Sequence, residues 1–207
     1  YISRMTAITN CRIFKGHQLL TNQHVLIEDG KIKAIIDTEV PEGYAVIDAA
    51  GSYLAAGCME LQIYGSGGNL FSAFPTVETL RQMDADLISK GTTSFMACLA
   101  TNSMEVFYQA IDAAKIYREE AKGFLGLHLE GPFLNPKRKG AHVEEYIHKA
   151  SLEEVKQLME HADGTVKIMT LAAELQDDEV IAYLLEQEVI LSLEHSDTSI
   201  EKATAAY

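Results

Sequence analysis

Hydrophobic residues in the first 55 positions fall in short runs that are typical of strands. Four of these runs are rich in Ile, Val and Thr, and they cover residues 6–14, 24–28, 31–37 and 45–48. Asp29-Gly30 separates the second run from the third, and this dipeptide between two such runs indicates a tight hairpin. Residues 1–55 are therefore predicted to form a small β unit.

After Gly57 the spacing alternates between strand and helix. Residues 76–90 carry apolar side chains at helical intervals, and Gly91 ends this pattern as a glycine after a helix does. Ser103 and Ser151 are placed as the capping residues of two further helices. Strands are expected at 58–64, 92–100, 123–130, 166–172 and 189–193, and helices at 76–90, 103–120, 151–161, 177–188 and from 199 onward.

Five strand–helix units in a row predict an α/β fold with a parallel sheet covered by helices. Two architectures fit, an open doubly wound sheet and a closed (β/α)8 barrel, and both place their chemistry at the C-terminal ends of the strands. No GxGxxG follows the first strand, which weakens a dinucleotide-binding interpretation. The glycines of residues 65–68 have the wrong spacing for that motif and are interpreted as a flexible turn.

Composition narrows the choice of partners. The 207 residues include 17 basic and 30 acidic side chains, a net charge of −13, which argues against nucleic acid and against an anionic membrane surface. No apolar run approaches the roughly 20 residues of a membrane span, and residues 1–10 lack the pattern of a signal peptide. Cys11, Cys58 and Cys98 are too few and too far apart for a disulfide framework, so a cytoplasmic location is expected.

Polar residues at two predicted strand ends suggest a metal site. His128 and Glu130 lie two apart and share one face of their strand, and His195 follows the run that ends at residue 193. Taken alone, Glu130 could be a carboxylate that is solvated by its loop. Taken alone, His195 could be a hydrogen-bonded structural histidine. A carboxylate and an imidazole on one rim are together a usual start for a zinc site, although two ligands are one short of a working one.

The loop between these strand ends contains three consecutive basic residues, 137–139, followed by His142. One interpretation is a solvated surface loop. The other is a loop over the strand ends that offers hydrogen-bond donors to an anionic or carbonyl-bearing substrate, with His142 polarising the carbonyl.

Three segments together resemble the N-acetylglucosamine-6-phosphate deacetylase family of the amidohydrolase superfamily. They are GLHLEGPFLN at 126–135 with KGAH at 139–142, LEHSDT at 193–198, and AGCMELQIYGSGG at 56–68. The resemblance implies a partial (β/α)8 TIM-type barrel at 56–207, with about five of eight units. It also implies a preceding β-sandwich-like unit, of which 1–55 would be the N-terminal part.

The resemblance also implies roles for individual residues. Glu130 and His195 would bind one divalent metal ion, zinc or alternatively iron(II), which lowers the pKa of a water to about 7 and so supplies hydroxide. His142 and the backbone of Ala141 would contact the substrate, N-acetylglucosamine 6-phosphate. Hydrolysis of its N-acetyl group would release acetate and glucosamine 6-phosphate. The complete protein is expected to be a homodimer.

Departures and gaps limit what these residues can do alone. Gln62 and Tyr64 stand where many superfamily members carry His-x-His, so one metal per chain is expected. A third metal-binding His, the general-base Asp and the phosphate-binding residues are expected beyond Tyr207, so residues 1–207 alone are predicted to be inactive. Two alternatives stay open: a dihydroorotase-like hydrolase of cyclic amides, and a non-catalytic sugar-phosphate-binding relative.

Overall fold

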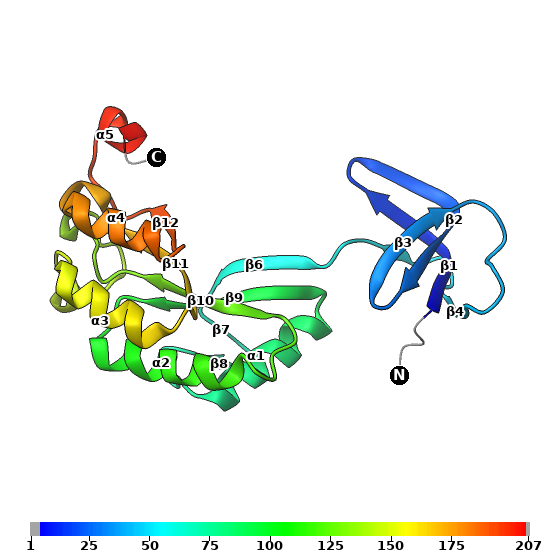
Figure 1. Cartoon of the computed structure of the whole chain (residues 1–207), viewed down its shortest axis with the longest axis horizontal. Helices are drawn as coiled ribbons and strands as arrows, with labels where there is room; N and C mark the ends of the chain where they lie inside the picture. Colours follow the sequence, from blue (N-terminus) through cyan, green and yellow to red (C-terminus); the bar gives the residue numbers. More distant parts are fainter. Residues whose placement is uncertain (1–4, 206–207) are drawn as a thin grey trace. The chain divides into compact units, whose positions relative to one another are not determined.

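The computed structural model describes residues 5–205, which fall into two compact units divided between Ala56 and Gly57 (Figure 1). The first unit is a sheet of five strands: β1 (Met5–Lys15), β2 (Gln18–Glu28), β3 (Lys31–Ile36), β4 (Ala45–Asp48) and β5 (Tyr53–Leu54). The strand order is β3-β2-β1-β4, with β5 also paired to β1. Its small core contains Cys11, Ile13 and Val25. The predicted small β unit is therefore present.

Two details of this unit follow from local chemistry. The Asp29-Gly30 hairpin is confirmed, and both residues have positive φ values of 48° and 77°, as a two-residue turn between twisted strands requires. Strand β2 begins at Gln18, six residues earlier than predicted, because its polar first half pairs with the end of β1. Pairing through the backbone leaves no signal in the side-chain pattern.

The second unit is built on a parallel sheet whose strand order is β12-β11-β10-β9-β6. Every predicted strand and helix of this unit is present. The strands are β6 (Cys58–Ile63), β9 (Thr92–Ala100), β10 (Phe124–Glu130), β11 (Val166–Leu171) and β12 (Ile190–Leu193). The helices are α1 (Val77–Ser89), α2 (Met104–Tyr117), α3 (Leu152–Ala162), α4 (Asp178–Glu186) and α5 (Ile200–Ala205).

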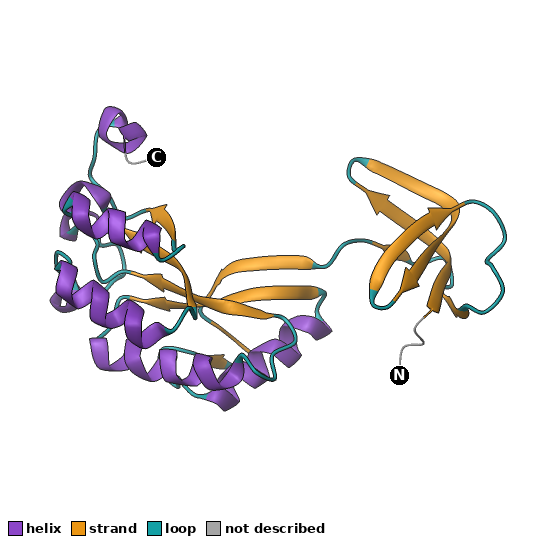
Figure 2. Ribbon diagram, in the orientation of Figure 1, coloured by secondary structure: helices purple, strands orange, loops and turns teal. Residues whose placement is uncertain are grey.

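The strand order places each strand beside the one before it, so the sheet has no point at which the order reverses. Right-handed crossovers that all step in the same direction put their helices on one face of the sheet. Figure 2 shows helices α1, α2 and α3 side by side along that face. Phe107, Ile111, Leu127, Leu129 and Leu158 are completely buried between helices and sheet, and they fix the strands against the helices.

The glycine-rich segment after β6 differs from its prediction. It forms a two-residue hairpin between β7 (Gly65–Ser66) and β8 (Asn69–Leu70) rather than a flexible turn. Gly67 and Gly68 supply the positive φ values, 65° and 89°, that the turn needs. Gly65 permits close backbone approach, since a Cβ there would lie 2.0 Å from the carbonyl oxygen of Asn69.

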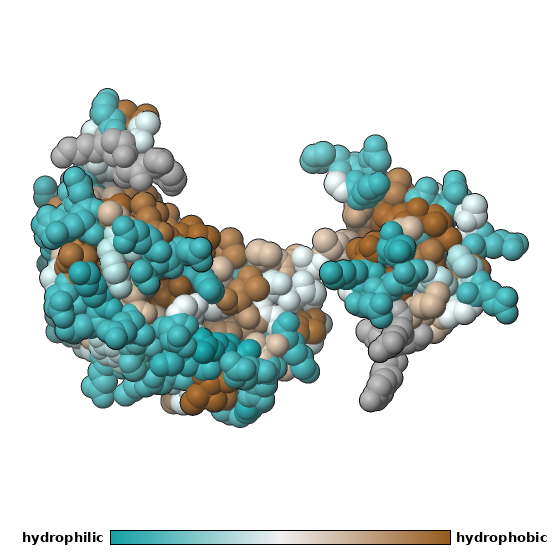
Figure 3. Space-filling model, viewed as in Figure 1, coloured by the Kyte–Doolittle hydropathy of each residue, from teal (hydrophilic) through white to brown (hydrophobic). Residues whose placement is uncertain are grey.

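The two sides of the parallel sheet differ in polarity. Figure 3 shows mainly hydrophilic atoms over the outer helices and apolar atoms exposed on the open side of the sheet. Among the exposed apolar side chains are Met59 and Leu61 on β6 and Ile190 on β12, at the two edges of the sheet. None of the helices between residues 5 and 205 has both the length and the apolar character needed to cross a membrane.

Candidate metal centre

Glu130 ends strand β10 and is 3% exposed, so its carboxylate is almost fully withdrawn from water. His128, two residues earlier, is equally buried, but both of its ring nitrogens are engaged within the sheet. Its Nδ1 lies 2.9 Å from the carbonyl oxygen of Leu61, and its Nε2 lies 2.7 Å from the Thr170 hydroxyl. His128 therefore ties three strands together, while Glu130 remains at the strand end.

Two neutral donors from β6 and the residue after it hold the Glu130 carboxylate. The Tyr64 hydroxyl donates to Oε2 at 2.6 Å, and the Gln62 amide donates to Oε1 at 3.2 Å. Gln62 also donates to the Tyr64 hydroxyl, at 3.0 Å. Burial, together with the hydrogen bond to Glu130, raises the pKa of Tyr64, so this hydroxyl stays protonated and keeps donating. The two donors orient the carboxylate without neutralising it.

His195 lies just beyond β12 and has a left-handed backbone, with φ of 48°. Its Nδ1 lies 2.9 Å from the carbonyl oxygen of Arg138, and its Nε2 lies 3.3 Å from Oε1 of Glu130. The backbone N–H of Asn135 also donates to the carbonyl oxygen of His195, at 3.0 Å. The loop after β10 thus holds His195 at both its ring and its backbone.

His142 completes the cluster from the same loop, and its side chain is only 6% exposed. Its Nε2 lies 3.2 Å from Nε2 of His195 and 3.6 Å from Oε1 of Glu130. Its Nδ1 faces Thr101, which follows β9, at 3.3 Å from the backbone nitrogen and 2.9 Å from the hydroxyl. Burial lowers the pKa of His142 against the opposing pull of the Glu130 charge, which favours the neutral imidazole.

These partners assign the protons of the two imidazoles. The Thr101 N–H can only donate, so Nδ1 of His142 accepts and the proton of its neutral ring is on Nε2. The Arg138 carbonyl can only accept, so Nδ1 of His195 donates and its Nε2 keeps a free lone pair. Glu130 and His195 consequently present lone pairs to the centre of the cluster, while His142 presents an N–H.

The donor set fits a divalent metal. One ligand atom each from Glu130, His142 and His195 lies within 4.8 Å of the others. The carboxylate oxygen of Glu130 and the imidazole nitrogen of His195 suit zinc and also iron(II), whereas Nε2 of His142 carries its proton in this arrangement. Among the described residues, no Lys or Arg forms an ion pair with Glu130, and the basic groups beside its carboxylate are the imidazoles of His142 and His195. A bound cation would therefore neutralise the buried negative charge of Glu130.

The remaining predicted site residues are placed as follows. Ala141 is exposed and directly precedes His142 in the loop. The basic residues 137–139 do not point their charges to the cluster: Arg138 pairs with Asp197 at 2.7 Å, and Lys139 pairs with Glu144 at 2.7 Å. Ion pairs with acidic residues of the same chain therefore account for the charges of Arg138 and Lys139. The contact that this basic segment makes with the cluster is through the backbone carbonyl of Arg138.

Two residues important to the cluster were missed by the sequence patterns. Thr101 follows β9 and sets the tautomer of His142, and Glu174 follows β11 and accepts hydrogen bonds from the loops on both sides of His195. Both lie within three residues of the end of a parallel strand, where functional side chains gather in such folds. Applying that rule to every strand end, rather than to histidines and their neighbours, would have found them.

Comparison with known proteins agrees with the motifs. Residues 5–54 match a family described as the NagA composite domain. The chain is 34% identical over 203 residues to the N-acetylglucosamine-6-phosphate deacetylase of Haemophilus influenzae, covering 97% of this chain and 53% of that protein. It is also 34% identical to the N-acetylgalactosamine-6-phosphate deacetylase of Shewanella sp., covering 94% of this chain and 52% of that protein.

Solved structures show the same relationship. The N-acetylglucosamine-6-phosphate deacetylase from Pasteurella multocida superposes with a TM-score of 0.87 at 34% identity, covering 98% of this chain and 54% of that one. The resemblance predicted from the motifs is thus confirmed, and the chain spans about half the length of the relatives it matches.

Proposed function

We propose, from its similarity to N-acetylglucosamine-6-phosphate deacetylases over nearly its whole length, that this chain contributes a metal centre to such an enzyme. The reaction is hydrolysis of the N-acetyl group of N-acetylglucosamine 6-phosphate to acetate and glucosamine 6-phosphate. The observation that carries the proposal is the convergence of Glu130, His142 and His195 at the strand ends of one parallel sheet. Because the relatives are about twice as long, the activity is proposed for the complete gene product containing these residues.

The proposed architecture is a partial (β/α)8 TIM-type barrel at 56–207 with five of eight units, preceded by a β-sandwich-like unit at 1–55. The sequential strand order, without a reversal, supports a barrel over a doubly wound sheet. The exposed edges at β6 and β12 fit a sheet that three further units would close. We further propose a cytoplasmic homodimer, as the family resemblance implies.

Glu130 and His195 are the proposed ligands of one divalent metal ion, with zinc as the first candidate and iron(II) as the alternative. Both residues present lone pairs, whereas His142 presents an N–H, which suits a donor to substrate rather than a ligand. When bound, the metal supplies Lewis acidity, lowering the pKa of a water to about 7 so that a nucleophile forms at neutral pH.

The other proposed roles belong to the loop after β10. His142 donates its Nε2 proton to the oxygen of the N-acetyl carbonyl, where negative charge develops during attack. Thr101 keeps that proton on Nε2, because its N–H occupies Nδ1. The backbone of Ala141, exposed beside His142, contacts the sugar. We assign no general base among residues 1–207.

Acetate release is the direct test of this function. The complete gene product is expected to release acetate from N-acetylglucosamine 6-phosphate, to lose that activity on chelation, and to regain it with Zn²⁺. The 207-residue chain alone is expected to release none. Hydrolysis of dihydroorotate or another cyclic amide, or tight sugar-phosphate binding without acetate release, would favour the two alternative functions.

A second substrate deserves the same assay because an equally similar relative is named for it. N-acetylgalactosamine 6-phosphate differs from the proposed substrate only in the orientation of one hydroxyl group, and the relative named for it is also 34% identical. In our proposal the metal ligands and His142 act at the N-acetyl group of the substrate, which the two sugars share, so these residues do not discriminate between them. A higher kcat/KM for the galactosamine compound would reassign the substrate and keep the mechanism.

Metal stoichiometry provides a further prediction. Gln62 and Tyr64 occupy the strand position that holds a second metal in many amidohydrolases, and here both are neutral donors to Glu130. An amide and a protonated phenol are poor zinc ligands. Elemental analysis of the complete gene product is expected to give one tightly bound metal ion per chain. A value of two would show that Gln62 and Tyr64 do not block the second site.

A further inference from the structure

A partly buried carboxylate, Glu174, joins the segments that carry His142 and His195. Glu174 is in a short helical turn after β11, η3 (Ala173–Leu175). Its Oε1 accepts from the Asn135 side-chain amide at 2.9 Å and from the Asp197 backbone N–H at 2.8 Å. Its Oε2 accepts from the Ser196 hydroxyl. One carboxylate thus joins the loop after β10 to the segment after β12.

His195 needs such support because of its backbone. A histidine with φ of 48° adopts a left-handed conformation that is strained for a residue with a Cβ, and such conformations persist only where the surroundings enforce them. Glu174 fixes the two residues that follow His195. It also fixes Asn135, whose own N–H binds the His195 carbonyl. The strained residue is therefore held from both sides through one side chain.

The electrostatics of Glu174 fit this role. Its partners in the structure are an amide, a hydroxyl and a backbone N–H, with no Lys or Arg among them in the described chain. Burial acts to raise the pKa of Glu174, but hydrogen bonds from Asn135, Ser196 and the backbone outweigh it and lower that pKa. The carboxylate is thereby retained as an acceptor of all three bonds.

We propose that Glu174 is a positioning residue of the metal centre, holding His195 so that its Nε2 faces Glu130. This inference rests on the proposed metal site and adds a residue that acts on it without touching the ion. Groups that orient a metal-binding histidine commonly contribute about 10–100-fold to metal affinity. Loss of the Glu174 bonds is expected to have an effect of that size.

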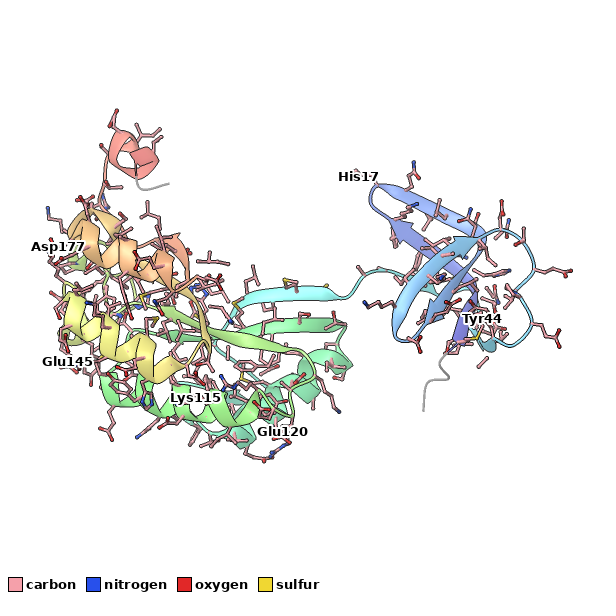
Figure 4. The ribbon with its side chains drawn as sticks, in the orientation of Figure 1. His17, Tyr44, Lys115, Glu120, Glu145 and Asp177 are labelled. Atoms are coloured by element: carbon pink, nitrogen blue, oxygen red, sulfur yellow. The ribbon has the colours of Figure 1, made fainter. Side chains whose placement is uncertain are left out.

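The test compares zinc affinities in the complete gene product by competition with a chromophoric chelator. E174A removes all three bonds and is expected to weaken zinc binding about 10–100-fold. E174Q keeps an oxygen for Asn135 and Asp197, and its amide can donate to Ser196, so it is expected to retain most of the zinc affinity that E174A loses. D177A removes a carboxylate three residues away that pairs with Lys149, at the outer edge in Figure 4, and serves as the matched control.

Separate outcomes distinguish this inference from the proposed function. Wild-type zinc affinity in E174A, or an equal loss in E174Q and E174A, would overturn the positioning role. If the wild type itself bound no zinc, the proposed metal site would fail. Hydrogen exchange in the metal-free protein would then test whether Glu174 holds the segment after His195. Because E174A removes the acceptor of the Asp197 backbone N–H, exchange of that amide must be faster in E174A but not in D177A. Unchanged exchange at Asp197 would refute the role independently of any metal.

Discussion

Replacing Glu130 with glutamine is expected to weaken zinc binding by more than about 100-fold, or about 2.7 kcal/mol. The carboxylate is the only anionic group of the three that converge at the strand ends, and the carbonyl oxygen of an amide is a much poorer zinc ligand. Acetate release by the complete gene product should fall with metal occupancy and be partly restored by excess Zn²⁺.

The same replacement is expected to leave the fold intact. Glutamine has nearly the size of glutamate, and its oxygen can still accept from the Tyr64 hydroxyl at the end of the buried strand. Removing the charge also removes the desolvation cost of a carboxylate that is 3% exposed. The thermal midpoint of metal-free E130Q should therefore be equal to that of the metal-free wild type or higher.

E145Q is the control for E130Q, because Glu145 is exposed and lies at the surface of the same unit (Figure 4). It should bind zinc like the wild type. Unchanged zinc affinity in E130Q would remove Glu130 from the ligand set. Loss of folding in E130Q would instead show that the carboxylate is needed mainly for its bonds to Gln62 and Tyr64.

Local periodicity predicted where the strand-end residues of this site lie, whereas the roles of Glu130, Ala141, His142 and His195 came from the family resemblance. Alternation along 123–130 put His128 and Glu130 on one face, and the end of the apolar run at residue 193 put His195 at the end of another strand of the same sheet, two strands from β10. Side-chain type could not separate the roles of the first two. His128 is a structural histidine only because the Leu61 carbonyl and the Thr170 hydroxyl meet its ring, and both come from other strands.

A strand-end rule could name Thr101 and Glu174 as candidates, but the contacts that they make across the fold were beyond the sequence. Glu174 is 39 residues from Asn135 and 23 from Asp197, so no local pattern connects them. The proton positions of His142 and His195 likewise depend on backbone groups of Thr101 and Arg138, which carry no side-chain signal. The same reason explains the first half of β2, which is held by backbone pairing with β1.

Replacing His142 with alanine is expected to lower kcat by about 10²–10³-fold while changing zinc affinity little. The expected split follows from the proton positions, since the Thr101 N–H occupies Nδ1 and leaves Nε2–H as a donor. A donor aimed at the developing negative charge acts in the transition state, so its loss appears in kcat more than in metal binding.

The control for H142A is H17A, because His17 is exposed at the tip of the β1–β2 hairpin in the other unit (Figure 4). Acetate release by H17A should match that of the wild type. A loss of zinc affinity in H142A as large as that in E130Q would make His142 a third ligand. That result would require its Nε2 to be deprotonated and the Thr101 bond to Nδ1 to break, because a neutral imidazole cannot accept at both nitrogens. A zinc affinity equal to that of the wild type, with a reduced kcat, would instead support the roles that the hydrogen bonds indicate. Glu130 and His195 would then be the ligands, and His142 would be the donor to substrate.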